Sequence, residues 1–384
     1  MLRTVAIAAA ALFVLSVAAH AVPAWGRRTG ADCSSCHWGL NKLNHTGRMF
    51  LLRGHRMPDE EGIGKEGYNL TEYTSWASKV RFVADKDADP STKFDVESLS
   101  IYSGGPIDKN FSYFFEYYMH ERAGDAAGAG SRSKLADAYL FYNSDAAADT
   151  FYWVRAGQIY PYLIYYYGSG GRLSISRNEA INRRPGGGNN YTPRDRAYGV
   201  SAGYVYEGNL LAEVGIVNSG GGNATPNIAE TNNFKDVYAT VEYVLDESGS
   251  GIGVYGYSGK FKDTTTNTED KFDRVGVFAN YTTPQYTISA GALSGKHDLP
   301  ASRRVRTWFA ELGYNFTDTT LGWVRYDHFY RDIATDAENR LVELSVGISH
   351  RLNSVGRLAV EYRNRKYSGR SDANDLTVEL NWLF

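Results

Sequence analysis

Alternation between apolar and polar residues, with a period of two, is the pattern that most constrains the fold of this chain. It runs from about residue 69 to the C-terminus, in segments separated by clusters of Gly, Asn, Asp, Ser and Thr. In the segment 111–119 every odd position is aromatic or Met, whereas Ser112, Glu116 and then His120 lie on the other face. The segment 236–245 alternates in the same way, with Val241 among its apolar residues and Glu242 on the opposite, polar face. Successive side chains of a strand point to opposite faces. The sequence therefore predicts an all-β fold whose strands have one apolar and one charged face.

The number and spacing of these segments indicate a barrel. The chain holds 29 Tyr, 17 Phe and 40 Gly but only 10 Pro, a composition that favours many strands joined by turns. We count roughly 16 segments of about ten residues, with short turns alternating with longer loops, as in transmembrane barrels. A soluble antiparallel sandwich has similar strands, but not this repetition. We therefore predict a transmembrane antiparallel β-barrel over residues 69–384.

The C-terminal segment supports a location in the outer membrane. In the last nine residues, LTVELNWLF, one face carries Leu376, Val378, Leu380, Trp382 and the terminal Phe384. Such an ending resembles the signal that the outer-membrane assembly machinery reads. The net charge of -2 gives no indication of a nucleic-acid partner. The expected surroundings of the barrel are outer-membrane lipids.

The first 21 residues have the features of an export signal. They carry the basic residue Arg3 near their start, continue through an apolar run and end on the small-x-small sequence Ala19-His20-Ala21. The apolar run is shorter than the roughly 18 residues that a membrane-spanning helix requires. We expect cleavage near Val22 and export of the mature chain.

The motif C-S-S-C-H directly follows the export signal. Its cysteines, Cys33 and Cys36, are the only two in the chain, and His37 comes next. Two cysteines at this spacing can form thioethers to both vinyl groups of one haem, and the adjacent histidine then binds the iron. A thiol redox site would need a βαβ context, and a zinc site would need further ligands, for which His45 and His55 have the wrong spacing. The motif therefore predicts one covalent haem c with His37 as the proximal iron ligand.

Four side chains are candidates for the distal iron ligand. In order of preference they are Met57, His55, His45 and Met49. Met57 comes first because His/Met ligation raises the reduction potential, which suits a haem that accepts an electron from a weak donor. The alternatives are that the methionines pack on the porphyrin and that the histidines are solvated.

The N-terminal region divides into a haem module, residues 22–57, and a linker, residues 58–68. The module is too short for an ordinary core, and we expect Leu40, Leu43, Phe50 and Leu51 to pack on the haem instead. Fully extended, the linker reaches about 33 Å. That length allows the module either to enter the lumen or to lie at the periplasmic mouth.

Residues 21–57 resemble the outer-membrane fused cytochrome-porins, known as iron oxidases of iron-oxidising bacteria. The similarity covers the residues just before the C-S-S-C-H motif, the motif itself and the residues that follow it up to residue 57. The matching positions outside the motif are Pro23, Arg28, Thr29, Gly30, Leu43, Gly47, Arg48, Phe50 and Gly54. Two positions depart from the family: a proline expected after the haem histidine is absent, and His55 stands where tyrosine is expected. This second departure leaves the distal ligand open.

The resemblance implies a function in electron transfer. It implies that the haem accepts one electron from extracellular Fe(II) and passes it to a periplasmic c-type cytochrome, as an Fe(II):cytochrome c oxidoreductase. The residues themselves do not identify iron, because no recognisable iron site is present in the sequence. A cation near the haem could be gathered by Asp59, Glu60, Glu61 and His55, although such a charge run is usually a solvated linker.

Two other functions compete with iron oxidation. The segment 157–162 and the arginine-rich stretch after it are similar to phosphate-selective porins, which suggests an anion or solute porin with a haem plug or sensor. Within the lumen these arginines would attract anions and repel Fe(II), whereas in an external loop they would merely be solvated. They are Arg172, Arg177, Arg183, Arg184, Arg194 and Arg196. The third possibility is an outward electron conduit to an external acceptor.

Overall fold

The computed structural model describes most of the chain after the predicted export signal. The described residues are 23–38, 42–64, 67–122, 131–169, 172–185, 189, 191–219, 230, 232–263, 266–299, 302–332 and 339–384. The predicted signal, residues 1–21, lies outside them. No helix in the described part of the chain is long and apolar enough to cross a membrane.

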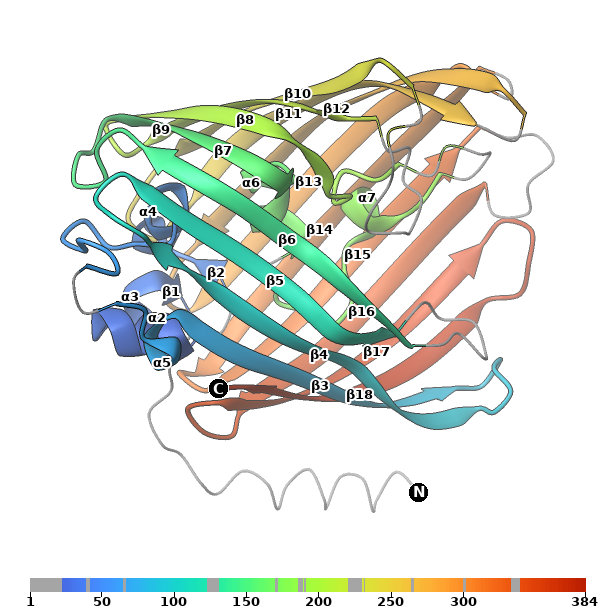
Figure 1. The fold of residues 1–384 in the computed structure, drawn as a ribbon. Coiled ribbons are helices and arrows are strands. Elements are labelled where there is room, and N and C mark those ends of the chain that lie inside the picture. Colours follow the sequence, from blue (N-terminus) through green and yellow to red (C-terminus); the bar gives the residue numbers. More distant parts are fainter. Residues whose placement is uncertain are drawn as a thin grey trace.

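Sixteen antiparallel strands form one closed barrel (Figure 1). Each strand pairs with its neighbours in sequence, and the last strand closes the barrel by pairing with the first, from Leu383 opposite Ala77 to Asp375 opposite Asp85. The predicted all-β barrel of about 16 strands is confirmed. The strands are β3 (Thr74–Asp85), β4 (Thr92–Pro106), β5 (Phe111–Arg122), β6 (Ser131–Asn143), β7 (Phe151–Ile159), β8 (Ala197–Tyr206), β9 (Leu210–Asn218), β10 (Lys235–Val244), β11 (Gly251–Asp263), β12 (Thr268–Thr282), β13 (Tyr286–His297), β14 (Arg303–Thr317), β15 (Thr320–Arg331), β16 (Arg340–Arg351), β17 (Gly356–Tyr367) and β18 (Ala373–Leu383).

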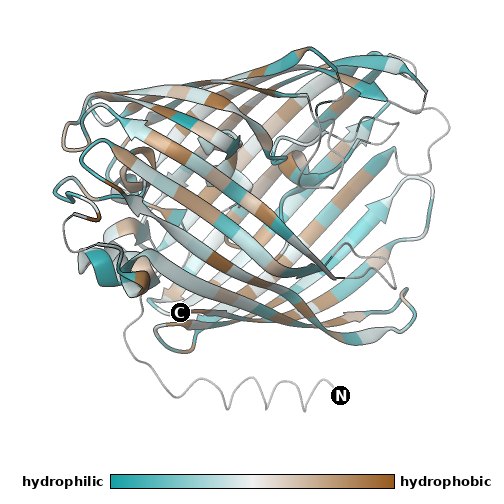
Figure 2. Cartoon of the chain, viewed as in Figure 1, coloured by the Kyte–Doolittle hydropathy of each residue, from teal (hydrophilic) through white to brown (hydrophobic). Residues whose placement is uncertain are grey.

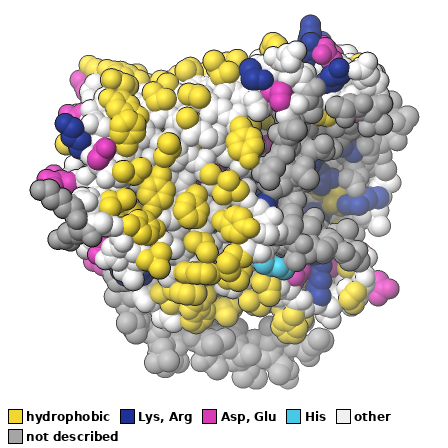
Figure 3. Space-filling model, in the orientation of Figure 1, with side chains coloured by type: hydrophobic (Ala, Val, Ile, Leu, Met, Phe, Trp, Pro, Cys, Tyr) yellow, Lys and Arg dark blue, Asp and Glu magenta, His cyan; other side chains and the backbone are white. Residues whose placement is uncertain are grey.

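The apolar faces of the strands point outward and the charged faces point into the barrel. On β10, Val241 and Tyr243 are 43% and 47% exposed, whereas Thr240 and Glu242 are only 6% and 3% exposed. Colour alternates along the strands in Figure 2, and the outer wall in Figure 3 is mostly apolar. A soluble sandwich buries its apolar faces, so this arrangement excludes the sandwich and fits a barrel surrounded by lipid.

The two ends of the barrel differ. At one end neighbouring strands are joined by short turns, such as those between β14 and β15 and between β16 and β17. The C-terminus lies at this end, where the backbone of Phe384 exchanges hydrogen bonds of 2.7 and 2.9 Å with that of Trp76. The helices that precede the barrel lie at the same end, at the left of Figure 1. Longer loops join the strands at the other end.

The longest described connection, between β7 and β8, folds into the lumen. It contains α6 (Tyr162–Ile164), the π-helical turn η1 (Tyr165–Ser169) and α7 (Glu179–Asn182). The backbone N–H of Ile175 donates to the Glu361 carboxylate of β17 at 3.0 Å, and Arg325 of β15 donates to the Ser176 hydroxyl at 2.8 Å. The arginine-rich stretch is therefore an inserted loop, and the alternative of an external loop is wrong.

The residues before the barrel form short elements. They are α2 (Pro23–Thr29), α3 (Cys33–Cys36), β1 (His37–Trp38), β2 (Lys42–Leu43), α4 (His45–Leu52) and α5 (Leu70–Tyr73). β1 and β2 pair as a small antiparallel hairpin. Helix α4 begins after Asn44 because the side chain of Asn44 accepts a hydrogen bond from the Gly47 N–H at 2.9 Å.

Candidate functional site

The C-S-S-C-H motif lies at the short-turn end of the barrel. Cys33 and Cys36 begin and end α3, one helical turn. The backbone thus places the two cysteine positions one helical turn apart, as in the C-x-x-C-H motif of c-type haem attachment. His37 follows in β1, opposite Leu43 of β2. Cys36 and His37 are both partly exposed.

Asn44 and Gly47 attach the motif to α4. The Asn44 side-chain amide donates to the Ser35 carbonyl at 3.0 Å, and the Asn44 backbone N–H donates to the Cys36 carbonyl at 3.0 Å. A Cβ atom at Gly47 would lie 2.3 Å from the Cys36 carbonyl oxygen, closer than any real contact. Only glycine therefore allows this close approach of α4 to the motif.

Arg48 of α4 fixes the module to the barrel. Its guanidinium pairs with Glu242 of β10, and donates to the Gly249 carbonyl at 2.7 Å and to the Asn280 side chain at 3.0 Å. It also lies 4.7 Å from the ring centre of Tyr166 in the inserted loop. Burial alone would lower the pKa of Arg48, but the carboxylate of Glu242 outweighs burial and raises it. Arg48 is therefore charged and compensated inside the protein.

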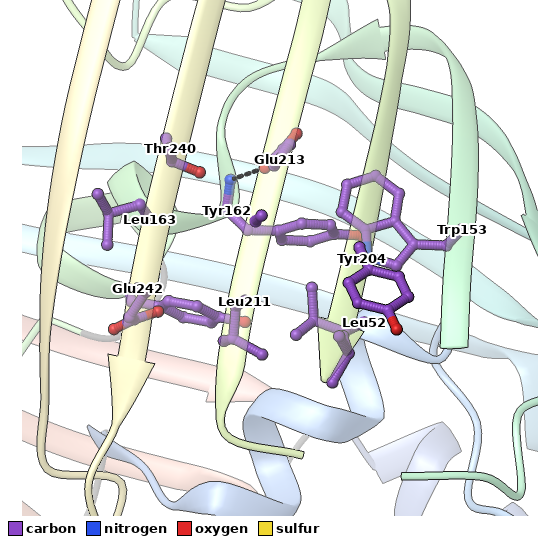
Figure 4. A pocket seen from close by; sticks show the side chains of 12 residues that line it. Leu52, Trp153, Tyr162, Leu163, Tyr204, Leu211, Glu213, Thr240 and Glu242 are labelled. Atoms are coloured by element: carbon purple, nitrogen blue, oxygen red, sulfur yellow. Dashed lines mark hydrogen bonds between the residues drawn. The ribbon is translucent and has the colours of Figure 1, made fainter. Parts of the chain in front are cut away.

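The apolar side of α4 packs into the lumen. Its residues Met49 to Leu52 belong to one buried cluster together with side chains of the barrel wall and of the inserted loop. In Figure 4 Leu52 lies beside Trp153 and Leu211, and the Tyr162 N–H donates to Glu213 at 3.0 Å. The cavity left between these groups is about 20 Å³, room for roughly one water molecule. The barrel thus supplies apolar partners for Phe50 and Leu51, and Leu43 packs at the edge of the same cluster. Leu40, the fourth residue expected to pack on the haem, lies outside the described residues.

Lys42, in the β1–β2 hairpin, lies close to the inserted loop. Its ammonium group lies 6.0 Å from the ring centre of Tyr167, and the side chain is only 6% exposed. Burial lowers the pKa of Lys42, and Glu311 of β14 partly opposes this effect. The hairpin therefore enters the lumen.

Further hydrogen bonds of residues 23–64 follow one side of the barrel mouth. The Ala24 N–H donates to the Ser75 hydroxyl of β3 at 2.9 Å, and Arg56 donates to the Lys109 carbonyl between β4 and β5 at 2.8 Å. A ring nitrogen of His45 lies 2.9 Å from the Gly208 carbonyl between β8 and β9. The contacts described for this region thus run from β3 round to β12. Residues 23–64 are called the module below.

The segment predicted as a linker also makes contacts. Glu60 pairs with Arg28 at 2.6 Å and accepts from the Met57 N–H at 2.6 Å, and the Ile63 N–H donates to the Ile107 carbonyl at 3.2 Å. Because Glu60 is engaged with Arg28, it does not join His55 around a cation. Among the residues that the structure describes, no group of three or more His, Cys, Asp or Glu side chains could hold a metal ion.

His55 is the most constrained of the four distal candidates. Its ring stacks on Phe114 at 4.5 Å between centres, and its Nε2 lies 2.9 Å from the Tyr139 hydroxyl. Its φ of 61° is in the left-handed region, which is uncommon for a residue with a side chain. Burial and the charges of Arg28 and Arg155 lower the pKa of His55 to about 3. His55 is therefore neutral and held by the barrel wall.

The other three distal candidates lie in different surroundings. His45 has one ring nitrogen near Gly208 and the other 3.7 Å from the Glu247 carboxylate. Met49 is 1% exposed in the shared core, whereas Met57 is partly buried at its edge. The order of preference from the sequence stays a prediction.

The donor set fits a c-type haem. Two cysteines one helical turn apart precede a partly exposed imidazole. The described residues contain no second C-x-x-C-H motif that could attach a haem. Cys33 and Cys36 would hold the porphyrin covalently and His37 would bind its iron. When bound, the group would supply a one-electron centre at the barrel mouth.

Sequence reasoning did not identify several residues that position this site. Arg48 was singled out only as a family match, and Glu242 only as part of a charged strand face. Arg155 of β7, which pairs with Glu213 at 2.6 Å and lies 4.1 Å from the Tyr162 ring centre, was not singled out at all. The sequence did contain a signal for Arg155 and Glu242, because a charged residue on the inner face of a barrel strand needs a partner of opposite charge in the lumen.

Comparisons with known proteins identify the fold. No family model and no curated protein matches the sequence. Among solved structures, the outer membrane channel DcaP of Acinetobacter baumannii is similar with a TM-score of 0.60 and 12% identity, over 81% of this chain and 96% of that one. The anion-selective porin from Comamonas acidovorans has a TM-score of 0.60 and 14% identity, over 81% and 98% of the two chains. Salmonella typhi OmpF has a TM-score of 0.59 and 14% identity, over 81% and 97%.

These likenesses concern the fold. The chain has the 16-stranded barrel of outer-membrane porins, and its apolar outer wall agrees with the outer-membrane location expected from the export signal and the terminal strand.

Proposed function

We propose that the protein transfers electrons across the outer membrane through one c-type haem on Cys33, Cys36 and His37. The observation that carries this proposal is that the motif is attached, through Asn44 and Gly47, to a helix fixed in the barrel by Arg48. A tethered module would need no buried ion pair with the wall. A fixed one holds a redox centre at a defined position, and electron transfer depends on such positioning.

The preferred donor is extracellular Fe(II), as the resemblance to fused cytochrome-porins implies. The arginines of the inserted loop oppose the entry of a free cation into the lumen, so this donor rests on the resemblance and not on the charge of the lumen. One Fe(II) would lose one electron and become Fe(III), and an oxidised periplasmic c-type cytochrome would gain that electron. The partly exposed Cys36 and His37 at the short-turn end support access by a periplasmic partner. The chain would then act as an Fe(II):cytochrome c oxidoreductase.

The test uses the purified full-length protein, matured with a cytochrome assembly system. Covalent haem should remain on the chain after denaturing electrophoresis. Anaerobic Fe(II) should then shift the absorption bands to the reduced form, as dithionite does. If dithionite reduces the protein and Fe(II) does not, iron is not the donor, and absence of bound haem would refute the whole proposal.

Two histidine variants make this test specific. His37→Ala should abolish the reduction by Fe(II), because it removes the proximal ligand. His120→Ala is the matched control, since His120 lies on β5 with its ring against the Val96 carbonyl, away from the module. The control should keep both the absorption bands and their response to Fe(II).

A second candidate is an anion or solute porin in which the module is a plug or sensor. Two observations favour it: similar solved structures are channels, one of them described as anion-selective, and the arginine-rich loop lies inside the lumen. Conductance of the holoprotein in planar bilayers separates the two functions. A persistent open pore with haem bound supports transport, whereas a closed pore that still responds to Fe(II) supports electron transfer.

A further inference from the structure

Basic side chains gather on the outer face of four neighbouring strands, β11 to β14, at their long-loop ends. They alternate along the strands with buried residues such as Gly259, Phe272 and Val305, so they lie on the lipid side of the wall and not in the lumen. Figure 3 shows Lys and Arg side chains at the upper right of the molecule, beyond the apolar part of the outer wall. These residues are called the basic patch below: Lys260, Lys262, Lys271, Lys296, Arg304 and Arg306.

The strand register places like charges of the basic patch directly opposite each other. Lys260 of β11 lies opposite Lys271 of β12. In the same way, Lys296 of β13 lies opposite Arg304 of β14. The Cβ atoms of directly opposite residues are only about 4.5–5.5 Å apart, and like charges in such positions destabilise a sheet. Two such pairs on four consecutive strands indicate that an anion outside the chain offsets the repulsion.

Carboxylates of the chain offset only part of this charge. Lys260 pairs with Glu269 at 2.5 Å, and Lys296 pairs with Asp298 at 3.0 Å. Both are surface ion pairs, which contribute little stability. The opposite members of the two like-charge pairs, on β12 and β14, have no carboxylate oxygen within 4 Å of their charged groups among the described residues. Half of the charge in these pairs is therefore left for an external anion.

A surface hollow of about 430 Å³ lies between these strands. Small-molecule sites have volumes of roughly 300–1,000 Å³. Both aspartates that line the hollow are engaged with Lys296: Asp298 through the ion pair, and Asp273 by accepting the Lys296 backbone N–H at 3.1 Å. The hollow also offers apolar surface, since Phe234 lines it and is 47% exposed. The lysines that line it are Lys260, Lys271 and Lys296.

The basic patch lies at the level where lipid headgroups meet the barrel. On β12 the exposed ring of Tyr281 is near the short-turn end, and Lys271 is ten positions away toward the long loops. Ten strand residues tilted by about 40° rise by about 25 Å, which is the height of the apolar band of a membrane barrel. The long loops of such barrels are extracellular, so the patch faces headgroups of the outer leaflet.

We propose that the basic patch binds the phosphate group of an anionic lipid in the outer leaflet. Ammonium groups of the hollow donate to the phosphate oxygens, and the acyl chains of the lipid lie along the apolar wall next to it, where Val254 and Val275 are exposed. The occupant is a lipid and not a free ion, because the patch faces the bilayer and continues directly into the apolar band. The proposal concerns the outer wall and is independent of haem binding and of conduction.

The test is native mass spectrometry of the purified full-length protein in detergent, titrated with diphosphoryl lipid A, a glycolipid that carries phosphate groups and acyl chains. We expect saturable binding. Lipid A without its phosphates should bind at least tenfold more weakly, and an equal concentration of inorganic phosphate should not displace the diphosphoryl form. Absence of saturable binding, equal binding of the dephosphorylated lipid, or displacement by inorganic phosphate would each overturn the proposal.

Variants without one or both lysines of the first like-charge pair locate the site. Lys271→Gln should weaken lipid A binding about fivefold, the contribution of one lysine beside an anionic membrane surface. Lys260→Gln combined with Lys271→Gln should weaken it about 25-fold. Lys366→Gln is the matched control, because Lys366 is exposed at the long-loop end of β17, opposite Val342 and not opposite a like charge. The control should bind lipid A as the wild type does.

A variant on another strand pair guards against local distortion. Arg304→Gln removes a charge from the second like-charge pair and should also weaken lipid A binding about fivefold. The folding of every variant can be checked by heat-dependent mobility in electrophoresis. Unchanged affinity of the folded double variant would show that the lipid binds elsewhere and would refute the assignment to the basic patch.

Discussion

Replacement of Arg48 by methionine should release the module from the barrel mouth. The exchange keeps much of the side-chain volume but leaves the Glu242 carboxylate, 3% exposed, without its cation. Removal of one partner of a buried ion pair costs about 3–5 kcal/mol. At 1.4 kcal/mol for each factor of ten, the undocked fraction should rise by roughly 100- to 4,000-fold.

Proteolysis in increasing urea measures this change. A short protease pulse cuts residues 23–64 only in molecules whose module has undocked, while the barrel itself resists. The urea concentration that gives half cleavage should fall sharply for Arg48→Met. Arg27→Met is the matched control, because Arg27 is exposed on α2 and, within the described residues, donates to the backbone carbonyls of Thr71 and Thr74 and to no carboxylate. We expect the control to change docking by no more than about 0.5 kcal/mol.

A double variant isolates the role of the charge. In Arg48→Met with Glu242→Leu, neither member of the ion pair remains, so no buried charge is left unpaired and much of the docking should return. Equal cleavage of Arg48→Met and wild type at every urea concentration would refute the reasoning that this ion pair fixes the module.

Three further predictions concern the module. Docking of the module should weaken as pH falls from about 6.5 toward 3, by up to about 1.4 kcal/mol per pH unit. The reason is that His55 binds a proton in the undocked state, whereas in the docked state its pKa of about 3 keeps it neutral. The same urea assay should find this pH dependence reduced in His55→Phe. Gly47→Ala should destabilise the docked module by about 1–3 kcal/mol, because the new methyl group would clash with the Cys36 carbonyl. Gly256→Ala, whose methyl group would meet nothing within 4 Å, should leave the urea concentration of half cleavage unchanged. Cys33→Ala should greatly reduce the haem stain that survives denaturing electrophoresis, and an undiminished stain would contradict thioether attachment at that residue.

Local periodicity was enough to predict the barrel. The alternation in residues 236–245 assigned Val241 to one face and Glu242 to the other, and both assignments are confirmed by their exposure. This succeeds because the side-chain period of a strand is a property of the strand alone. The number of strands followed from counting such segments.

The arrangement inside the barrel could not be predicted in the same way. Arg48 and Glu242 are 194 positions apart, and nothing local to either residue identifies the other. The inserted loop posed the same difficulty, since Ser176 meets Arg325 only after the barrel has closed. The burial of His55 likewise depends on Phe114 and Tyr139 of the wall.

The shared core of α4 and the barrel has a consequence for biogenesis. Met49 to Leu52 share their core cluster mostly with side chains of β-strands and of the inserted loop, while Trp25, Leu43 and Met57 of the module pack only at its edge. Residues 23–64 therefore have no complete core until those strands have assembled. During transit through the periplasm this segment is therefore open to enzymes that act on its thiols. If Cys33 and Cys36 hold a haem as proposed, its ligation should precede insertion of the barrel, and membrane assembly would then complete the fold of the segment that was modified first.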